Sequence, residues 1–109
     1  MITQYEVYNL LSAEIPPLSC MEYPSKSHLK IYASINYFTD YTMVAINQHN
    51  ISQLKKCFSV AEKLYMNGDS LVKLLIRKNF IYSLLSLGSI TDIDKEMIKK
   101  MIPKAISKN

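Results

Sequence analysis

The stretch from Asn50 to Ser86 constrains the fold most, because it has the pattern of two helices joined by a tight turn. Asn50, with Gln53 three residues later, is typical of a helix N-terminus whose cap side chain accepts a hydrogen bond from the first turn. Asn67-Gly68 ends this helix, and we expect Gly68 in the left-handed conformation that helix C-termini favour. Asp69 caps the second helix. The apolar stripe of the first helix is Leu54, Cys57, Phe58, Ala61, Leu64 and Tyr65.

The second helix of this hairpin is apolar on every side. A helix of this kind is covered by its neighbours, so we expect it at the centre of the fold. A DNA-recognition helix has to present polar side chains to the bases, so the pattern also argues against a helix-turn-helix. Asn79, Ser83 and Ser86 form a narrow polar stripe, which we interpret as small residues allowing close helix approach rather than as a functional site. The apolar residues are Leu71, Val72, Leu74, Leu75, Ile76, Phe80, Ile81, Tyr82, Leu84, Leu85 and Leu87.

Two helices are expected before the hairpin. Thr3 and Glu6 form the T-x-x-E pattern of a capping box, which predicts that a helix of about three turns starts there. Pro16-Pro17 stops it, because proline has no N–H to donate and pushes the preceding residue out of the helical region. A loop at 15–26 then leads to a long helix at 27–48.

The long helix has one apolar face with helical spacing over five turns, which outweighs the strand preference of its β-branched residues. Tyr37 and Tyr41 fall partly off this face, with Asp40 between them, so exposed tyrosines are one expectation for this segment. The residues predicted to face inward are Tyr32, Ile35, Thr39, Thr42 and Ile46, widened by Ile31, Phe38 and Ala45.

A fifth, short helix follows the hairpin. Thr91 with Asp94 is its predicted cap, Pro103 ends it, and residues 104–109 are expected to fray. The chain is therefore predicted to form a single all-α domain, residues 1–109, of about five helices. Short turns between neighbours favour antiparallel helical hairpins or a small bundle.

No constellation of residues indicates catalysis, a metal site or a cofactor. His28 and His49 have no cysteine, histidine or carboxylate at ligand spacing. Asp92 and Asp94 fall in the first turn of a predicted helix, where the helix dipole favours acids. Cys57 lies on an apolar stripe, where a thiol is a poor nucleophile. We therefore expect a protein that is not an enzyme and that binds no cofactor or metal.

The chain shows no targeting or membrane pattern. Its N-terminus lacks a basic region and carries Glu6, so we do not expect a signal peptide. The most apolar run, 71–87, is interrupted by Lys73, Arg77 and Lys78, which argues against a membrane span. Cys20 and Cys57 do not form a metal-type pair. We expect a reduced, cytoplasmic protein.

Charge is unevenly distributed along the chain. The formal net charge is +4, yet residues 1–50 carry more acidic than basic side chains, and the lysines concentrate in 51–109. A basic half can bind nucleic acid, so a small nucleic-acid-binding regulator is one hypothesis. We favour a solvated lysine-rich surface, because these lysines are scattered over several predicted helices.

Tyrosines in the acidic half supply the candidate binding residues. Tyrosine suits protein interfaces because its ring buries a large area while its hydroxyl stays available to water or a partner. Exposed tyrosines among carboxylates would suit a basic protein partner. The alternative is that they pack at the rim of the core with wet hydroxyls. The candidate partner-binding residues are Glu22, Tyr23, Tyr37, Asp40 and Tyr41.

About half of the chain resembles a family of small, uncharacterised, all-helical bacterial proteins. The resemblance is carried by LKKCF (54–58), AEKLY (61–65), NGD (67–69) and Val72-Lys73, and extends from FTDYT (38–42) to FIYSLLSL (80–87). Members of such families often accompany bacterial polymorphic toxins. The resemblance therefore implies an immunity protein that binds a cognate toxin, and it assigns no functional residues.

The leading hypothesis is thus a non-enzymatic inhibitor that occludes the active site of a toxin domain with the acidic, tyrosine-bearing surface of 22–41. A nucleic-acid-binding regulator using the lysine-rich half is the alternative. The toxin, its activity, the interface and the oligomeric state are left open.

Overall fold

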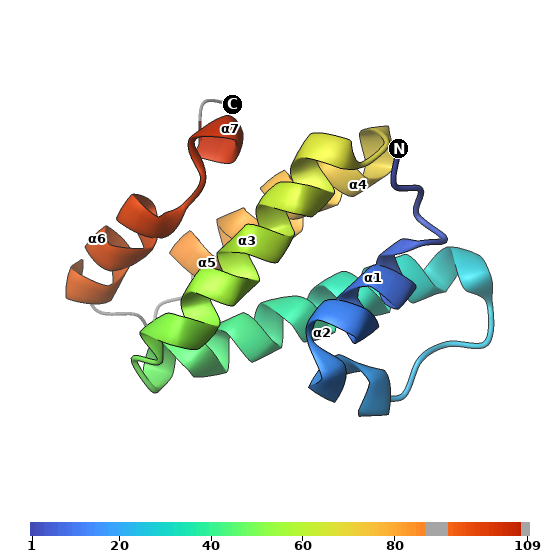
Figure 1. Ribbon diagram of the computed structural model, residues 1–109, viewed down its shortest axis with the longest axis horizontal. Helices are drawn as coiled ribbons and strands as arrows, with labels where there is room; N and C mark the ends of the chain where they lie inside the picture. Colours follow the sequence, from blue (N-terminus) through green and yellow to red (C-terminus); the bar gives the residue numbers. More distant parts are fainter. Residues whose placement is uncertain (87–91, 108–109) are drawn as a thin grey trace.

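The computed structural model describes residues 1–86 and 92–107, and most of these residues are helical (Figure 1). The predicted all-α fold is confirmed. In chain order the helices are α1 (Val7–Glu14), a 3-10 helix (Pro16–Cys20), α2 (Ser27–Asn47), α3 (Ile51–Asn67), α4 (Ser70–Leu75), a π-helical segment (Ile76–Ile81), α5 (Tyr82–Ser86), α6 (Asp92–Met101) and α7 (Lys104–Ser107).

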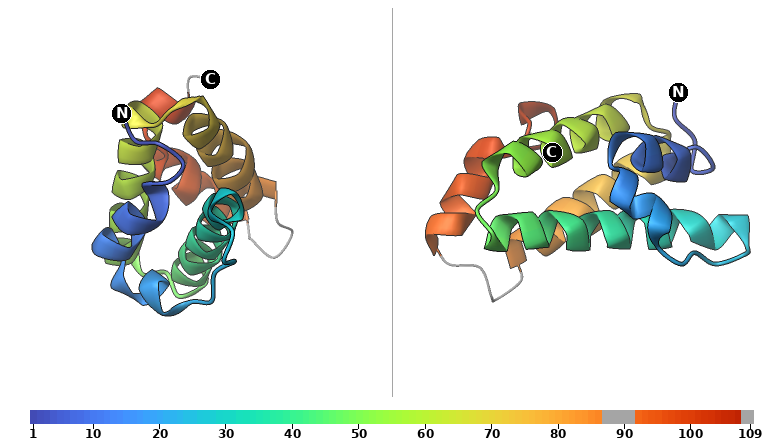
Figure 2. Two further views of the ribbon diagram at one scale, coloured as in Figure 1. Left: turned by 90° about the vertical axis from the view of Figure 1, so that its right-hand side faces the viewer. Right: turned by 60° about the horizontal axis from the view of Figure 1, so that its bottom comes forward.

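The long helices α2 and α3 form an antiparallel hairpin, and the continuous rod of α4, the π segment and α5 lies against both (Figure 1). Helix α1 and the 3-10 helix cover one side of α2, while α6 and α7 pack at the opposite end of the molecule (Figure 2). The predicted Asn50 cap is confirmed, because its side-chain oxygen accepts from the Gln53 N–H at 3.1 Å. Asp69 likewise accepts from the Val72 N–H at 3.0 Å.

The centre of the core is an aromatic trio that joins three segments. Phe38 of α2 stacks on Phe80 of the π segment with ring centroids 4.4 Å apart, and Phe58 of α3 meets Phe80 edge-on at 6.2 Å. Such pairs add to the stabilisation from burying large rings. Buried hydroxyls do not disturb this core, since Thr39 and Thr42 each donate to the carbonyl four residues back in α2. Of the residues predicted to face inward on α2, Tyr32 is exposed instead.

The π segment explains how a helix apolar on every side is accommodated. Val72, Ile76, Phe80 and Leu84 recur every fourth residue and are all fully buried. In an ordinary α-helix such a repeat drifts by about 40° at each step, because a turn takes about 3.6 residues. A wide turn with i→i+5 hydrogen bonds removes this drift in the middle of the rod. The four side chains therefore stay on one line.

The opposite face of the same rod is open to solvent, so the expectation that this helix is covered on all sides is not met there. Leu74 is 43% exposed and Tyr82 is 67% exposed. Lys73 and Lys78 are exposed beside them. The wide turn aligns Leu74, Lys78 and Tyr82 by the same geometry that aligns the buried line.

Gly68 is not in the predicted left-handed conformation. Its φ of −78° and ψ of 159° are extended. A positive φ, 54°, is instead found at His49, in the turn between α2 and α3 at the opposite end of α3. Glycine is required at this position because a larger residue would not fit. A Cβ there would lie 2.5 Å from Val72 Cγ1 and would collide with the carbonyl oxygen of Leu64. The N-terminal segment also docks here, because Ile2 exchanges backbone hydrogen bonds with Asn67 and Asp69.

The first helix is tied to the hairpin by an ion-pair clamp. Half of the predicted capping box forms, since the Thr3 backbone N–H donates to the Glu6 carboxylate at 3.0 Å. The Thr3 hydroxyl also donates to this carboxylate and does not accept from the backbone, and helical geometry starts only at Val7. At the other end of α1, Glu14 accepts from Lys56 at 2.6 Å and from Lys63 at 2.9 Å, two lysines of α3. These two hydrogen-bonded ammonium groups lower the pKa of Glu14 from 4.5 to about 2.

The C-terminal segment does not fray as expected. Residues 104–107 form α7, which packs on α3, and Ile106 is only 2% exposed. Pro103 does end α6 as predicted, and the buried Ile106 then returns the chain to the core. The predicted Thr91–Asp94 cap lies outside the residues whose side chains the structure describes.

Replacing Gly68 with alanine should destabilise the fold by about 1–3 kcal/mol, the usual range for overpacking. The added methyl group has to displace Val72, which is fully buried, or the backbone of Leu64. Urea unfolding measures the effect, with Ser59→Ala on the exposed face of α3 as the control. Equal stability of the two variants would contradict the close approach at Gly68.

Glu14→Gln should flatten the acid limb of the stability curve. The folded-state pKa of Glu14 lies below its ordinary value, so its contribution is complete above 4.5 and is lost as the pH falls toward about 2. The wild type should therefore lose more stability than the variant between about pH 6 and pH 3. Urea midpoints at both pH values provide the measurement, with Glu62→Gln on α3 as the matched carboxylate control. A variant that loses as much stability as the wild type would refute the clamp.

Candidate protein-binding site

The described part of the chain contains no cluster of metal-ligating side chains. No three side chains of His, Cys, Asp or Glu within residues 1–86 and 95–106 lie close enough to hold a metal ion. Cys57 is fully buried, and this burial raises the pKa of its thiol. Cys20 is exposed. None of the helices described has both the length and the unbroken apolar character needed to cross a bilayer.

The predicted partner-binding residues come from two segments that the structure brings side by side. Glu22 and Tyr23 follow the 3-10 helix, whereas Tyr37, Asp40 and Tyr41 lie on one side of α2. The hydroxyl of Tyr37 donates to the backbone carbonyl of Glu22 at 2.7 Å, which fixes the loop against α2. Sequence reasoning grouped these residues by charge and residue type, and a hydrogen bond across fifteen positions is what joins them in space.

Three tyrosines form a ladder of edge-to-face rings behind this contact. Tyr8 of α1 meets Tyr23 at 4.7 Å, and Tyr23 meets Tyr37 at 5.2 Å. The Lys30 ammonium lies 3.9 Å from the centre of the Tyr8 ring, in cation–π contact. Tyr23 donates its hydroxyl to the carbonyl of Leu18 at 2.6 Å. Burial, with Tyr8 and Tyr37 nearby, raises the pKa of Tyr23.

Tyr23 and Tyr37 are therefore structural residues at the rim of the core. Both are half-buried, and both hydroxyls are bonded to backbone carbonyls instead of being free for a partner. They match the alternative expectation, that these tyrosines pack at the rim of the core, better than the expectation that they are exposed. Their hydroxyls, however, contact the backbone and not water. Their role is to hold the loop that shapes the neighbouring surface.

That surface is a hollow of about 360 Å³ between the loop and α2, named here the α2 hollow. Met21 and Val44 are 41% and 52% exposed, so two apolar side chains stand open to solvent. Asp40 is exposed at the same place and supplies a carboxylate. The hollow is lined by Met21, Tyr37, Asp40, Tyr41 and Val44.

Two lining residues, Met21 and Val44, were missed by the sequence analysis. Val44 lies one helical turn beyond Asp40 and Tyr41, so helical spacing alone could have added it to the group. Met21 could not be placed, because its position depends on the path of the loop that Tyr37 holds. An exposed apolar floor with a carboxylate beside it suits an apolar side chain and a cation of another protein.

Two other hollows are lined by different kinds of side chain. One of about 170 Å³ lies between Lys30 and the start of α1 and has a mixed polar and aromatic lining. The other, of about 300 Å³, lies between α3 and the α6–α7 connection. The second is lined by Lys55 and Glu62 on either side of Phe58, which is itself only 3% exposed. The first hollow exposes an aromatic ring, that of Tyr5, whereas the α2 hollow exposes the flexible and branched apolar side chains of Met21 and Val44.

Tyr37→Phe should cost about 1 kcal/mol of stability, the usual net value of one hydrogen bond, and should loosen the loop. Backbone relaxation of residues 21–23, measured by nuclear magnetic resonance, should show increased motion, because the Glu22 carbonyl loses its donor. Tyr82→Phe is the matched control, since Tyr82 is 67% exposed. Unchanged relaxation at 21–23 would show that the hydroxyl does not hold the loop.

Comparison with known proteins gives a family and no function. No curated protein and no solved structure matches this chain significantly. A family model described as a domain of unknown function, DUF7674, matches residues 8–108. This range begins at the second residue of α1 and includes all the later helices of the structure. The chain belongs to the DUF7674 family of uncharacterised domains.

Proposed function

We propose that this protein is a non-enzymatic, protein-binding inhibitor that uses the α2 hollow to engage a basic partner. The observation that carries the proposal is the pairing of exposed Met21 and Val44 with the Asp40 carboxylate in one concave site. The resemblance to families that accompany toxins makes an immunity protein the form we favour. In this form it acts in the bacterial cytoplasm and occludes the active cleft of a cognate toxin domain.

The scaffold favours inhibition by a preformed surface. The loop that carries Met21 and Glu22 is held by hydrogen bonds from Tyr23 and Tyr37, so little ordering is required when a partner binds. A site that is ordered before binding loses less conformational entropy on association. An apolar side chain of the toxin would enter the hollow while a neighbouring lysine or arginine contacts Asp40.

The test is stoichiometric neutralisation of toxin domains encoded beside this gene. Each candidate is produced with and without this protein, and growth and complex formation are measured. We expect a complex with one toxin-like protein and neutralisation that is complete at equal amounts of the two chains. Neutralisation at far less than one inhibitor per toxin would indicate an enzyme and overturn the proposal.

Site variants locate the interface in that complex. Asp40→Lys and Val44→Lys should each weaken binding by about thirtyfold or more, the loss of at least 2 kcal/mol expected for a buried interface residue. Glu62→Lys, which reverses a charge on the exposed face of α3, should leave the affinity unchanged. Titration calorimetry gives the affinities. Binding that survives both α2 substitutions would move the interface away from the hollow.

A further inference from the structure

The open face of the α4–α5 rod is a second surface whose residues are aligned by the π segment. Leu74, Lys78 and Tyr82 follow one another every fourth residue, and the wide turn keeps them in line along the rod. We name this line, with Lys73 and Arg77 beside it, the basic ridge. Internal π turns occur often at functional sites, because they place side chains where an α-helix does not.

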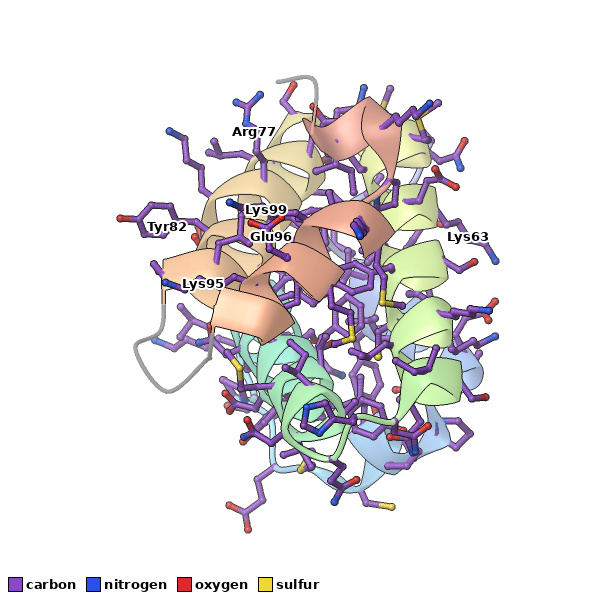
Figure 3. All side chains as sticks on the ribbon, turned by 90° about the vertical axis from the view of Figure 1, so that its left-hand side faces the viewer. Lys63, Arg77, Tyr82, Lys95, Glu96 and Lys99 are labelled. Atoms are coloured by element: carbon purple, nitrogen blue, oxygen red, sulfur yellow. The ribbon has the colours of Figure 1, made fainter. Side chains whose placement is uncertain are left out.

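The ridge is cationic over residues 73–78. The rod from Ser70 to Ser86 contains Lys73, Arg77 and Lys78 and no acidic residue. Figure 3 shows Arg77 and Tyr82 on the same side of the molecule as Lys95 and Lys99 of α6, whereas Lys63 lies apart on α3. The Lys99 charge is partly balanced by Glu96, at 3.7 Å. The three cations on the rod thus make the charge of this face positive.

Apolar groups alternate with the cations on the ridge, and this decides the kind of partner. Leu74 and Tyr82 stand on either side of Lys78, about two helical turns apart. A nucleic acid would engage the cations through phosphates, but it would leave the aliphatic Leu74 against a polar backbone. A protein helix can present leucine side chains to Leu74 and Tyr82 and carboxylates to the cations at the same spacing.

We propose that the basic ridge is a docking surface for an acidic amphipathic helix of another protein. The helix lies along the α4–α5 rod, with its apolar side chains against Leu74 and Tyr82. Its carboxylates contact Lys73, Arg77 and Lys78. This surface carries a charge opposite to that of the α2 hollow, and the inference does not rest on the proposed inhibitory function.

The test uses the full-length protein and a designed peptide of about 20 residues, with leucines on one helical face and glutamates flanking them. Nuclear magnetic resonance titration should show micromolar binding with shifts centred on residues 73–82. A twin peptide with lysine in place of glutamate should not bind. A twin with serine in place of leucine should bind at least about tenfold more weakly, because the apolar contacts are lost.

Variants of the ridge complete the test. Lys73→Glu with Lys78→Glu should abolish binding, and Leu74→Ser with Tyr82→Ser should weaken it about tenfold while circular dichroism shows an intact fold. Lys55→Glu with Lys100→Glu is the control with the same charge change, and it should bind as the wild type does. Peptide shifts elsewhere on the molecule, or equal loss in the control, would overturn the proposal.

Competing occupants are separated in the same experiment. Tighter binding of a single-stranded oligonucleotide than of the acidic peptide, lost in the Lys73→Glu, Lys78→Glu variant, would replace the proposal with nucleic-acid binding. Binding of anionic vesicles in preference to the peptide would replace it with membrane docking. Self-association that the same variant abolishes would assign the ridge to a second copy of the chain.

Discussion

The stacking of Phe38 on Phe80, with Phe58 edge-on, is the interaction on which the arrangement of the long helices depends. Phe80 reaches that position only because the rod widens between Ile76 and Ile81. Without the wide turn, a side chain every fourth residue would rotate away from the core, by more than 100° between Val72 and Leu84. The π turn therefore gives the rod a continuous buried line that contacts α2 and α3.

The same turn determines what the molecule shows to solvent. Aligning Val72, Ile76, Phe80 and Leu84 on the inside necessarily aligns Leu74, Lys78 and Tyr82 on the outside, because both sets recur every fourth residue. Packing and surface composition are thus consequences of one backbone feature. An insertion or deletion within 76–81 would disturb the core and the exposed line together.

The sequence predicts a structural feature well when that feature depends on residues that are neighbours in the chain. The Asn50 and Asp69 caps, the helix ends at Asn67 and Pro103, and the stripe of α3 were predicted correctly, since each depends on a few neighbouring residues. The extended conformation of Gly68 was not predicted. Glycine is needed there because Val72 and Leu64 leave no room for a side chain, and not because of its backbone angle φ. The docking of Ile106 and of Ile2 was missed for the same reason: both depend on contacts with distant segments.

The candidate site shows this limit at the level of single side chains. Charge and residue type grouped Tyr37, Asp40 and Tyr41 with Glu22 and Tyr23, and the structure does place the two segments together. The roles within the group could not be read from the sequence. Tyr23 and Tyr37 use their hydroxyls to hold the loop, which leaves Asp40, Met21 and Val44 as the exposed surface.

Electrostatics gives the two surfaces different expected partners. The α2 hollow has Asp40 beside apolar side chains, while the basic ridge has Lys73, Arg77 and Lys78 beside apolar side chains. Helix α2 packs against α1 and the 3-10 helix with one flank and against the π segment with another, so the two surfaces are separated by the aromatic core. The two proposals therefore call for partners of opposite charge, a basic one at the hollow and an acidic one at the ridge, because unlike charges steer association and like charges oppose it.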